Sequence, residues 1–161
     1  MMAHGFPVFG SVFLIALSAQ AGKDHVMKRS LWSFGGMIRL VTGRRPLDFD
    51  GYGNYCGFYG KGIPVDDLDK CCQTHDRCYQ SLSEDPCNWD LRTYIYPYSW
   101  KGTKDALGNR TIACLDEPES CQKTLCDCDK TASECFARNE YNRTQKRLRP
   151  TSVIKWVPYL G

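Results

Sequence analysis

The chain has 161 residues, ten cysteines and a formal net charge of +3. Without the first 29 residues the net charge falls to about +1, because that segment carries more basic than acidic residues. A nearly neutral chain excludes a general polyanion binder, so we expect no nucleic-acid partner. The basic cluster at residues 143–149 fits either a solvated end or a partner-binding patch. The remaining chain suffices for one domain with a modest core.

The beginning of the chain has the composition of a removable leader. An apolar run from Phe6 to Ala19 precedes small residues, which predicts a secretory signal peptide over residues 1–21. The alternative, a transmembrane anchor, needs about 20 apolar residues, and this run is shorter. The pair Lys28-Arg29 predicts a propeptide over residues 22–29. We therefore expect a secreted protein without a transmembrane anchor, with one domain over residues 30–147 and a C-terminal extension over 148–161.

Helix signals follow in chain order. Residues 31–40 have the apolar spacing of a short amphipathic helix, which ends at Thr42-Gly43. Residues 50–62 are rich in glycine and tyrosine, which is typical of an irregular loop. Pro64 and the acidic residues after it predict the start of a helix over residues 66–82. A second long helix is expected over residues 119–141.

The segment between the two long helices predicts a β-hairpin. Residues 93–100 alternate aromatic and other side chains, as a short strand does. Leu107-Gly108-Asn109 is a turn signal, and residues 110–112 return toward Cys114.

The first long helix carries a group of chemically reactive side chains. On a helix, Cys72, His75, Asp76 and Tyr79 fall at i, i+3, i+4 and i+7 and so share one face. The histidine can handle a proton while the carboxylate holds a cation. The segment is therefore predicted to be a catalytic helix.

The cysteines indicate disulfides and not a zinc site. All ten lie between Cys56 and Cys135, an even number in a chain that we expect to be secreted. An oxidising compartment would convert zinc-type thiols to disulfides. Spacing alone leaves the pairing open.

Five sequence blocks occur in order at compatible spacing. They are Leu31-Trp32-Ser33-Phe34-Gly35-Gly36-Met37-Ile38, Tyr52-Gly53-Asn54-Tyr55-Cys56-Gly57, Asp69-Lys70 with the run from Cys71 to Tyr79, Tyr96-Pro97-Tyr98-Ser99, and Leu125-Cys126-Asp127-Cys128-Asp129. Together these blocks resemble the secreted phospholipase A2 family. The resemblance implies a mainly α, disulfide-rich fold. It has an N-terminal helix, a calcium-binding loop, a small β-hairpin and two long antiparallel helices cross-linked by disulfides.

The resemblance also implies a disulfide pairing. The pairs are Cys56 with Cys72, Cys71 with Cys135, Cys78 with Cys128, Cys87 with Cys121, and Cys114 with Cys126. The chain departs from the family pattern at Leu40, Asn54 and Trp100, where cysteines are often found. Leu40 and Trp100 replace both ends of one bridge, so we expect an apolar pair there. Tyr59 stands where the family nearly always has glycine.

By resemblance, the activity is calcium-dependent hydrolysis of the sn-2 ester of glycerophospholipids. His75 is the expected base for water and Asp129 its supporting carboxylate, with Tyr79 and Tyr96 as hydrogen-bond donors to Asp129. One calcium ion is expected on Asp76 and on the backbone carbonyls of Tyr55, Gly57 and Tyr59. The Gly57 N–H is expected to face the oxyanion. The alternative hypothesis is a catalytically silent binding or mineral-matrix protein.

Other expectations concern the lipid surface and glycans. Leu31, Phe34, Ile38, Phe49 and Phe58 match residues of an apolar acyl-chain channel, and their alternative is ordinary core. An aromatic rim on a membrane or micelle surface is expected from Trp32, Phe58, Tyr59 and Ile63, the alternative for Trp32 being interior packing. Asn109 and Asn142 begin glycosylation motifs. The sequence identifies no protein partner.

Overall fold

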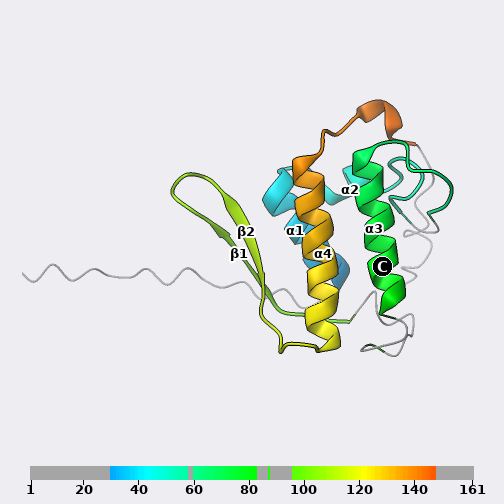
Figure 1. The fold of residues 1–161 in the computed structure, drawn as a ribbon. Coiled ribbons are helices and arrows are strands. Elements are labelled where there is room, and N and C mark those ends of the chain that lie inside the picture. Colours follow the sequence, from blue (N-terminus) through cyan, green and yellow to red (C-terminus); the bar gives the residue numbers. More distant parts are fainter. Residues whose placement is uncertain (1–29, 58–59, 83–86, 88–95, 148–161) are drawn as a thin grey trace, which may run out of the picture.

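The described part of the chain is mainly helical, with one small hairpin (Figure 1). The computed structural model describes residues 30–57, 60–82, 87 and 96–147. The predicted leader and the C-terminal extension therefore lie outside the described residues. In order, the elements are α1 (Ser30–Thr42), α2 (Pro46–Phe49), α3 (Asp67–Ser81), β1 (Trp100–Lys104), β2 (Arg110–Cys114), α4 (Cys121–Arg138) and the short 3-10 helix η2 (Arg143–Gln145). The predicted fold class is confirmed.

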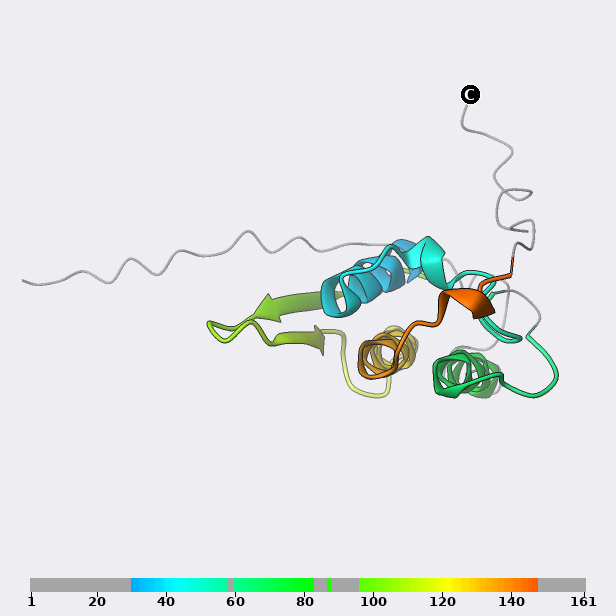
Figure 2. The same cartoon turned by 90° about the horizontal axis from the view of Figure 1, so that it is seen from above.

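Helices α3 and α4 lie side by side and antiparallel, and α1 packs across α4 (Figures 1 and 2). The hairpin projects away from this layer (Figure 2). Helix α1 contributes neighbouring side chains to two core clusters: Met37 packs with Leu125 and Tyr98, while Ile38 packs with Phe49 and Leu68. Among the described helices, none is long and apolar enough to cross a membrane.

Capping side chains set the ends of the long helices. Asp66 caps α3 by accepting a hydrogen bond from the Asp69 N–H at 2.8 Å. Ser120 caps α4 through the Lys123 N–H at 3.2 Å. The prediction for α3 is confirmed to within one residue at each end. Helix α4 ends three residues earlier than predicted, because Asn139 adopts an extended conformation at its C-terminus.

The first helix ends where predicted, and two short elements elsewhere had not been predicted. Helix α1 continues to Thr42, where Gly43 turns the chain with a φ of 71°. The short α2 and η2 had no clear signal, since each has only a few residues.

The hairpin exists, but the predicted position of its first strand is wrong. Strand β1 begins at Trp100, where the prediction ended, and residues 93–95 lie outside the described residues. The strand pairs with β2 in the register Trp100 to Cys114 and Lys104 to Arg110. Four of the five β1 residues are exposed, so the strand has no apolar alternation to reveal it. Residues 96–99, which the prediction includes in the strand, precede it without regular structure.

Five disulfides cross-link the described elements and leave no free cysteine among them. They join Cys56 with Cys72, Cys71 with Cys135, Cys78 with Cys128, Cys87 with Cys121, and Cys114 with Cys126, the pairing that the resemblance implied. Two of them join α3 to α4, and each has a Cα–Cα distance of 5.8 Å. Leu40 and Trp100 both pack over Gly102: a Cβ there would lie 2.4 Å from the Leu40 side chain and 3.1 Å from Trp100. An apolar contact therefore occupies this position, as expected.

Candidate active site

The two long helices bring His75 and Asp129 together. The His75 Nε2 atom lies 2.7 Å from Asp129 Oδ1, although the residues are 54 positions apart. Asp129 is fully buried, whereas the His75 side chain keeps 15% of its surface exposed. The disulfides Cys71–Cys135 and Cys78–Cys128 flank this pair along both helices. The arrangement holds one histidine at the solvent boundary against a buried carboxylate.

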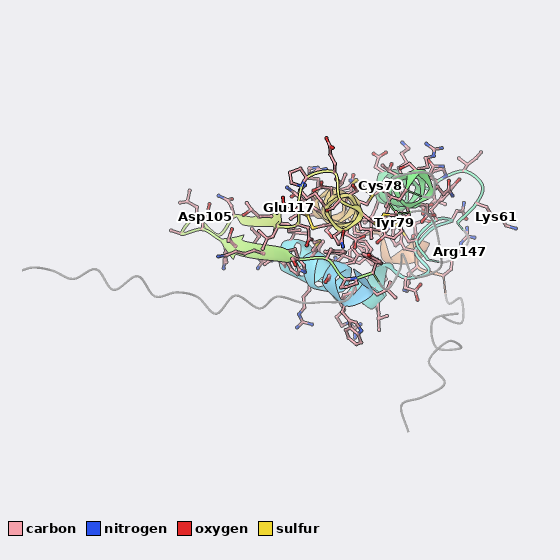
Figure 3. The ribbon with its side chains drawn as sticks, turned by 90° about the horizontal axis from the view of Figure 1, so that it is seen from below. Lys61, Cys78, Tyr79, Asp105, Glu117 and Arg147 are labelled. Carbon is pink, nitrogen blue, oxygen red and sulfur yellow. A yellow bond between two sulfur atoms is a disulfide. The ribbon has the colours of Figure 1, made fainter. Side chains whose placement is uncertain are left out.

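Two tyrosine hydroxyls donate to the same carboxylate. Tyr79 donates to Asp129 Oδ1 at 2.9 Å, and Tyr98 donates to Asp129 Oδ2. Figure 3 shows Tyr79 between α3 and α4. Burial, followed by the charge of Asp129, raises the pKa of Tyr98, so its hydroxyl stays protonated and donates. The Asp129 carboxylate accepts hydrogen bonds from both hydroxyls, so His75 is assigned as a further donor to it, with the ring proton on Nε2. The Nδ1 atom then carries a lone pair.

The expected donor Tyr96 is wrong, and Tyr98 takes its place. Tyr96 is 41% exposed, whereas Tyr98 is 1% exposed and reaches the carboxylate. Both tyrosines stand in one short block on either side of Pro97. Sequence alone could not decide which of the two side chains faces α4.

The residues predicted to line a channel have different surroundings. Phe34 stacks on the His75 ring with a centroid distance of 4.6 Å and an interplanar angle of 15°. Ile38 and Phe49 are buried, and Phe49 stacks on Phe136 at 4.7 Å. Leu31 is 48% exposed. Phe58 lies outside the described residues. Phe34 thus borders the histidine, while Ile38 and Phe49 belong to the core.

A second carboxylate of the site, Asp76 on α3, lies beside the glycine-rich loop. A Cβ added at Gly60 would lie 2.7 Å from Tyr55 Cα and 2.8 Å from Asp76 Oδ2, so only glycine permits this approach. Burial raises the pKa of Asp76 to about 6, and His75 opposes this shift. Within the described residues, no lysine or arginine forms an ion pair with Asp76. A desolvated carboxylate against loop backbone is a suitable place for a cation with oxygen ligands.

The expected calcium ligands are partly testable in this structure. The described residues contain no cluster of three or more histidine, cysteine or acidic side chains that could hold a metal. The expected set needs only one such side chain, because its other ligands are backbone carbonyls. Gly57 has a φ of 130°, a conformation that a side chain would strain. Tyr59 lies outside the described residues.

A buried aspartate that the sequence analysis did not single out holds the loop. Asp69 is fully buried and accepts hydrogen bonds from the N–H groups of Asn54 at 2.8 Å, Tyr55 at 2.8 Å and Val65 at 3.0 Å. A Cβ at Gly53 would lie 2.3 Å from this carboxyl group. Asn54, at a frequent cysteine position, instead donates to the Ile63 carbonyl at 2.7 Å. The only sequence signal was Asp69 within a family block.

The expected surface features lie outside the histidine site. Trp32 and Ile63 are 70% and 82% exposed, so Trp32 does not pack in the interior. The two glycosylation motifs start at exposed asparagines, Asn109 at the hairpin turn and Asn142 before η2. Asn109 donates through its side chain to Asp105, whose place at the hairpin tip is visible in Figure 3.

Fold and site together define a small disulfide-linked hydrolase with a histidine–aspartate pair. Comparison with known proteins gives the family: the model named "Phospholipase A2" matches residues 31–146. The chain therefore belongs to the phospholipase A2 family. The resemblance and the prediction of a phospholipase A2 enzyme are confirmed at this level.

Several curated relatives cover most of the chain. A "Phospholipase A2" of Bos taurus is 40% identical over 141 residues, which is 85% of this chain and 94% of the relative. A "Phospholipase A2, membrane associated" of Mus musculus is 44% identical over 80% of this chain and 83% of the relative. "Phospholipase A2 SSD387" of Scolopendra dehaani is 35% identical over 88% of this chain and 98% of the relative.

Proposed function

We propose that this chain is a secreted, calcium-dependent phospholipase A2. It hydrolyses the sn-2 ester of glycerophospholipids and releases a free fatty acid and a lysophospholipid. The observation that carries the proposal is the His75–Asp129 pair, with Nε2 and Oδ1 2.7 Å apart on disulfide-linked helices. The second carboxylate, Asp76, lies beside the loop.

His75 acts as the general base in this proposal. Its Nδ1 atom accepts a proton from water as the water oxygen attacks the ester carbonyl, and the same proton later passes to the leaving alcohol. General-base catalysis of this kind contributes about 10²- to 10⁴-fold to the rate. Asp129 keeps the proton on Nε2 and stabilises the imidazolium, while Tyr79 and Tyr98 fix the carboxylate.

Calcium is the proposed cofactor. Asp76 and the carbonyls of Tyr55, Gly57 and Tyr59 would hold one ion, and the close approach at Gly60 supports this set. When bound, calcium supplies positive charge for the substrate phosphate and for the developing oxyanion. The Gly57 N–H is the proposed hydrogen-bond donor to that oxyanion, beside the calcium ion. Gly57 has a φ of 130°, which favours glycine, and this conformation is compatible with a carbonyl that binds calcium and an N–H that faces the oxyanion.

The proposed partner is a membrane or micelle surface. Leu31, Trp32 and Ile63 are 48%, 70% and 82% exposed, which supports an apolar contact with lipid. Phe58 and Tyr59 would extend the rim. The nearly neutral charge expected after removal of the leader favours tolerance of zwitterionic lipid over dependence on anionic lipid.

Secretion is proposed from the leader and the disulfides. The signal-like residues 1–21 and the basic pair Lys28-Arg29 predict an N-terminus at Ser30. Five disulfides need an oxidising compartment to persist. In that compartment, the motifs at Asn109 and Asn142 are accessible glycosylation sites.

The test is fatty-acid release from mixed phospholipid vesicles by protein that begins at Ser30. We expect release from the sn-2 position in millimolar calcium, none in excess chelator, and a loss of about 10²- to 10⁴-fold in His75→Gln. Mass spectrometry of the disulfides and circular dichroism verify that the variant is folded. If the folded wild-type protein released no fatty acid, the proposal would fail and the non-catalytic binding role would replace it.

A further inference from the structure

The described C-terminal end of the chain pairs with the start of the glycine-rich loop. Residues 142–147 form what we call the C-terminal strap. The Gly53 N–H donates to the Gln145 carbonyl at 3.0 Å, and the Arg147 N–H donates to the Gly51 carbonyl at 2.9 Å. Tyr52 and Lys146 are partners in an antiparallel bridge. Figure 3 shows Arg147 beside the loop. The strap is thus paired with residues 51–53 of the loop by a short stretch of antiparallel β hydrogen bonds.

The Lys146 side chain reaches back over this pairing. Its ammonium group donates to the Leu47 carbonyl at 2.8 Å and to the Asp50 carbonyl. A hydrogen bond from a charged donor is stronger than one between neutral groups. One cation therefore joins the strap to the last turn of α2 and to the residue that enters the loop.

A tyrosine joins the strap to the catalytic helix. Tyr52 is fully buried; its hydroxyl donates to Asp66 Oδ2 at 2.5 Å and accepts from the Asn142 N–H at 3.3 Å. Asp66 is the N-cap of α3. Burial, with the hydrogen bond to Asp66 next, raises the pKa of Tyr52 to about 12, so the hydroxyl remains a donor. The strap, the loop entry and the start of α3 are connected through this one side chain.

The segment that the strap holds leads directly to the proposed calcium ligands. The Gly51 N–H donates to the Cys56 carbonyl at 2.7 Å, and Gly53 lies against the Asp69 carboxyl group that receives the Tyr55 N–H. A displacement of residues 51–53 would therefore move Tyr55 and Gly57. The strap itself contains no cysteine, so no disulfide fastens it to the loop.

We propose that Lys146 is a positioning residue that holds the glycine-rich loop in its cation-binding conformation before any cation binds. The proposal rests on the proposed function, because it assigns the loop to calcium. It predicts that the loss of the ammonium group loosens the pairing between the strap and residues 51–53 in the calcium-free protein. It also predicts weaker calcium binding, with unchanged disulfides and an unchanged helix pair.

The test compares Lys146→Met with Lys104→Met in the secreted full chain. The control removes the same charge from an exposed residue of β1 on the hairpin. Amide hydrogen exchange is measured in chelator, and calcium affinity by titration calorimetry. In Lys146→Met we expect the Gly53 and Arg147 amides to exchange about tenfold faster and the calcium Kd to rise about threefold to tenfold. The control keeps wild-type values, and the Leu125 amide in α4 reports that the fold is intact.

Two results would overturn the proposal. One is wild-type protection of the Gly53 and Arg147 amides in Lys146→Met. The other is faster exchange with an unchanged calcium Kd, because the strap would then not position the ligands. If the wild-type protein itself bound no calcium, the proposed function would fail. The exchange rates alone would then support or overturn the role of Lys146 in holding the loop.

Discussion

The His75–Asp129 pair and the glycine-rich loop are neighbours, but disulfides hold the first and mainly hydrogen bonds hold the second. His75 and Asp129 lie on helices that two disulfides join directly. The loop has one disulfide, Cys56–Cys72, and is otherwise held by hydrogen bonds, among them those to Asp69 and to residues 145–147. Covalent links fix the helix pair whatever binds, whereas the loop conformation depends on polar contacts. Damage to the pair should therefore lower kcat, and damage to the loop should weaken calcium binding.

The largest effect is expected at Asp129, where a substitution should change kcat and leave calcium affinity unchanged. Asp129→Asn replaces one acceptor oxygen by an NH2 group, so the proton on His75 Nε2 loses its defined acceptor. We expect kcat to fall by about 10²- to 10⁴-fold. Asp127→Asn is the matched control on the same helix, since Asp127 is 46% exposed and pairs with Lys123. Both variants should bind calcium as the wild type does; a weakened affinity in Asp129→Asn would contradict the separation.

The next effect is expected in the loop at Asp69. Asp69→Asn removes the charge that accepts the Asn54, Tyr55 and Val65 amides. We expect calcium affinity to fall by about tenfold to 100-fold and the free energy of unfolding to fall by about 3 kcal/mol. At saturating calcium, kcat should return toward the wild-type value. Calorimetry and chemical denaturation measure both, with the exposed Asp67→Asn as control. A permanent loss of kcat would show that the helix pair also depends on Asp69.

A smaller effect on calcium binding is expected from pH, through protonation of Asp76. Because the pKa of Asp76 is raised to about 6, protons compete with calcium below that value. Calcium affinity should fall about tenfold between pH 7.5 and pH 5 in calorimetric titrations. The raised pKa also means that the folded, calcium-free protein binds more protons than the unfolded chain between about pH 4 and pH 6. Its stability should therefore fall as pH rises through that window. An affinity independent of pH would remove Asp76 from the ligand set.

The smallest expected effect lies in neither region. At Gly102 an added Cβ would meet Leu40 at 2.4 Å and Trp100 at 3.1 Å. Gly102→Ala should lower the free energy of unfolding by about 1 to 3 kcal/mol through overpacking. Adding Leu40→Ala should recover part of this loss, and a double-mutant cycle measures the coupling. Neither kcat nor calcium affinity should change, and a change in either would link the hairpin to the site.

Local spacing in the sequence was enough to predict several features of this protein. Cys71 and Cys78 are seven positions apart on α3, and Cys128 and Cys135 are seven apart on α4. This spacing puts both cysteines of each helix on the face that meets the other helix. The same periodicity placed His75 and Tyr79 on one face of α3, where their rings lie 4.6 Å apart. The family blocks supplied the fold, the pairing of the cysteines and the supporting carboxylate.

Which groups complete the site depends on long-range packing. It selected Tyr98 over Tyr96, assigned Asp69 to the loop amides and brought residues 145–147 against residues 51–53. These contacts join segments 14 to 96 positions apart in the chain. No periodic pattern encodes them, because they arise only when α4 packs beside α3 and the chain after α4 returns to the loop. Local spacing therefore predicted the catalytic helix, and long-range packing determined how its partners are held.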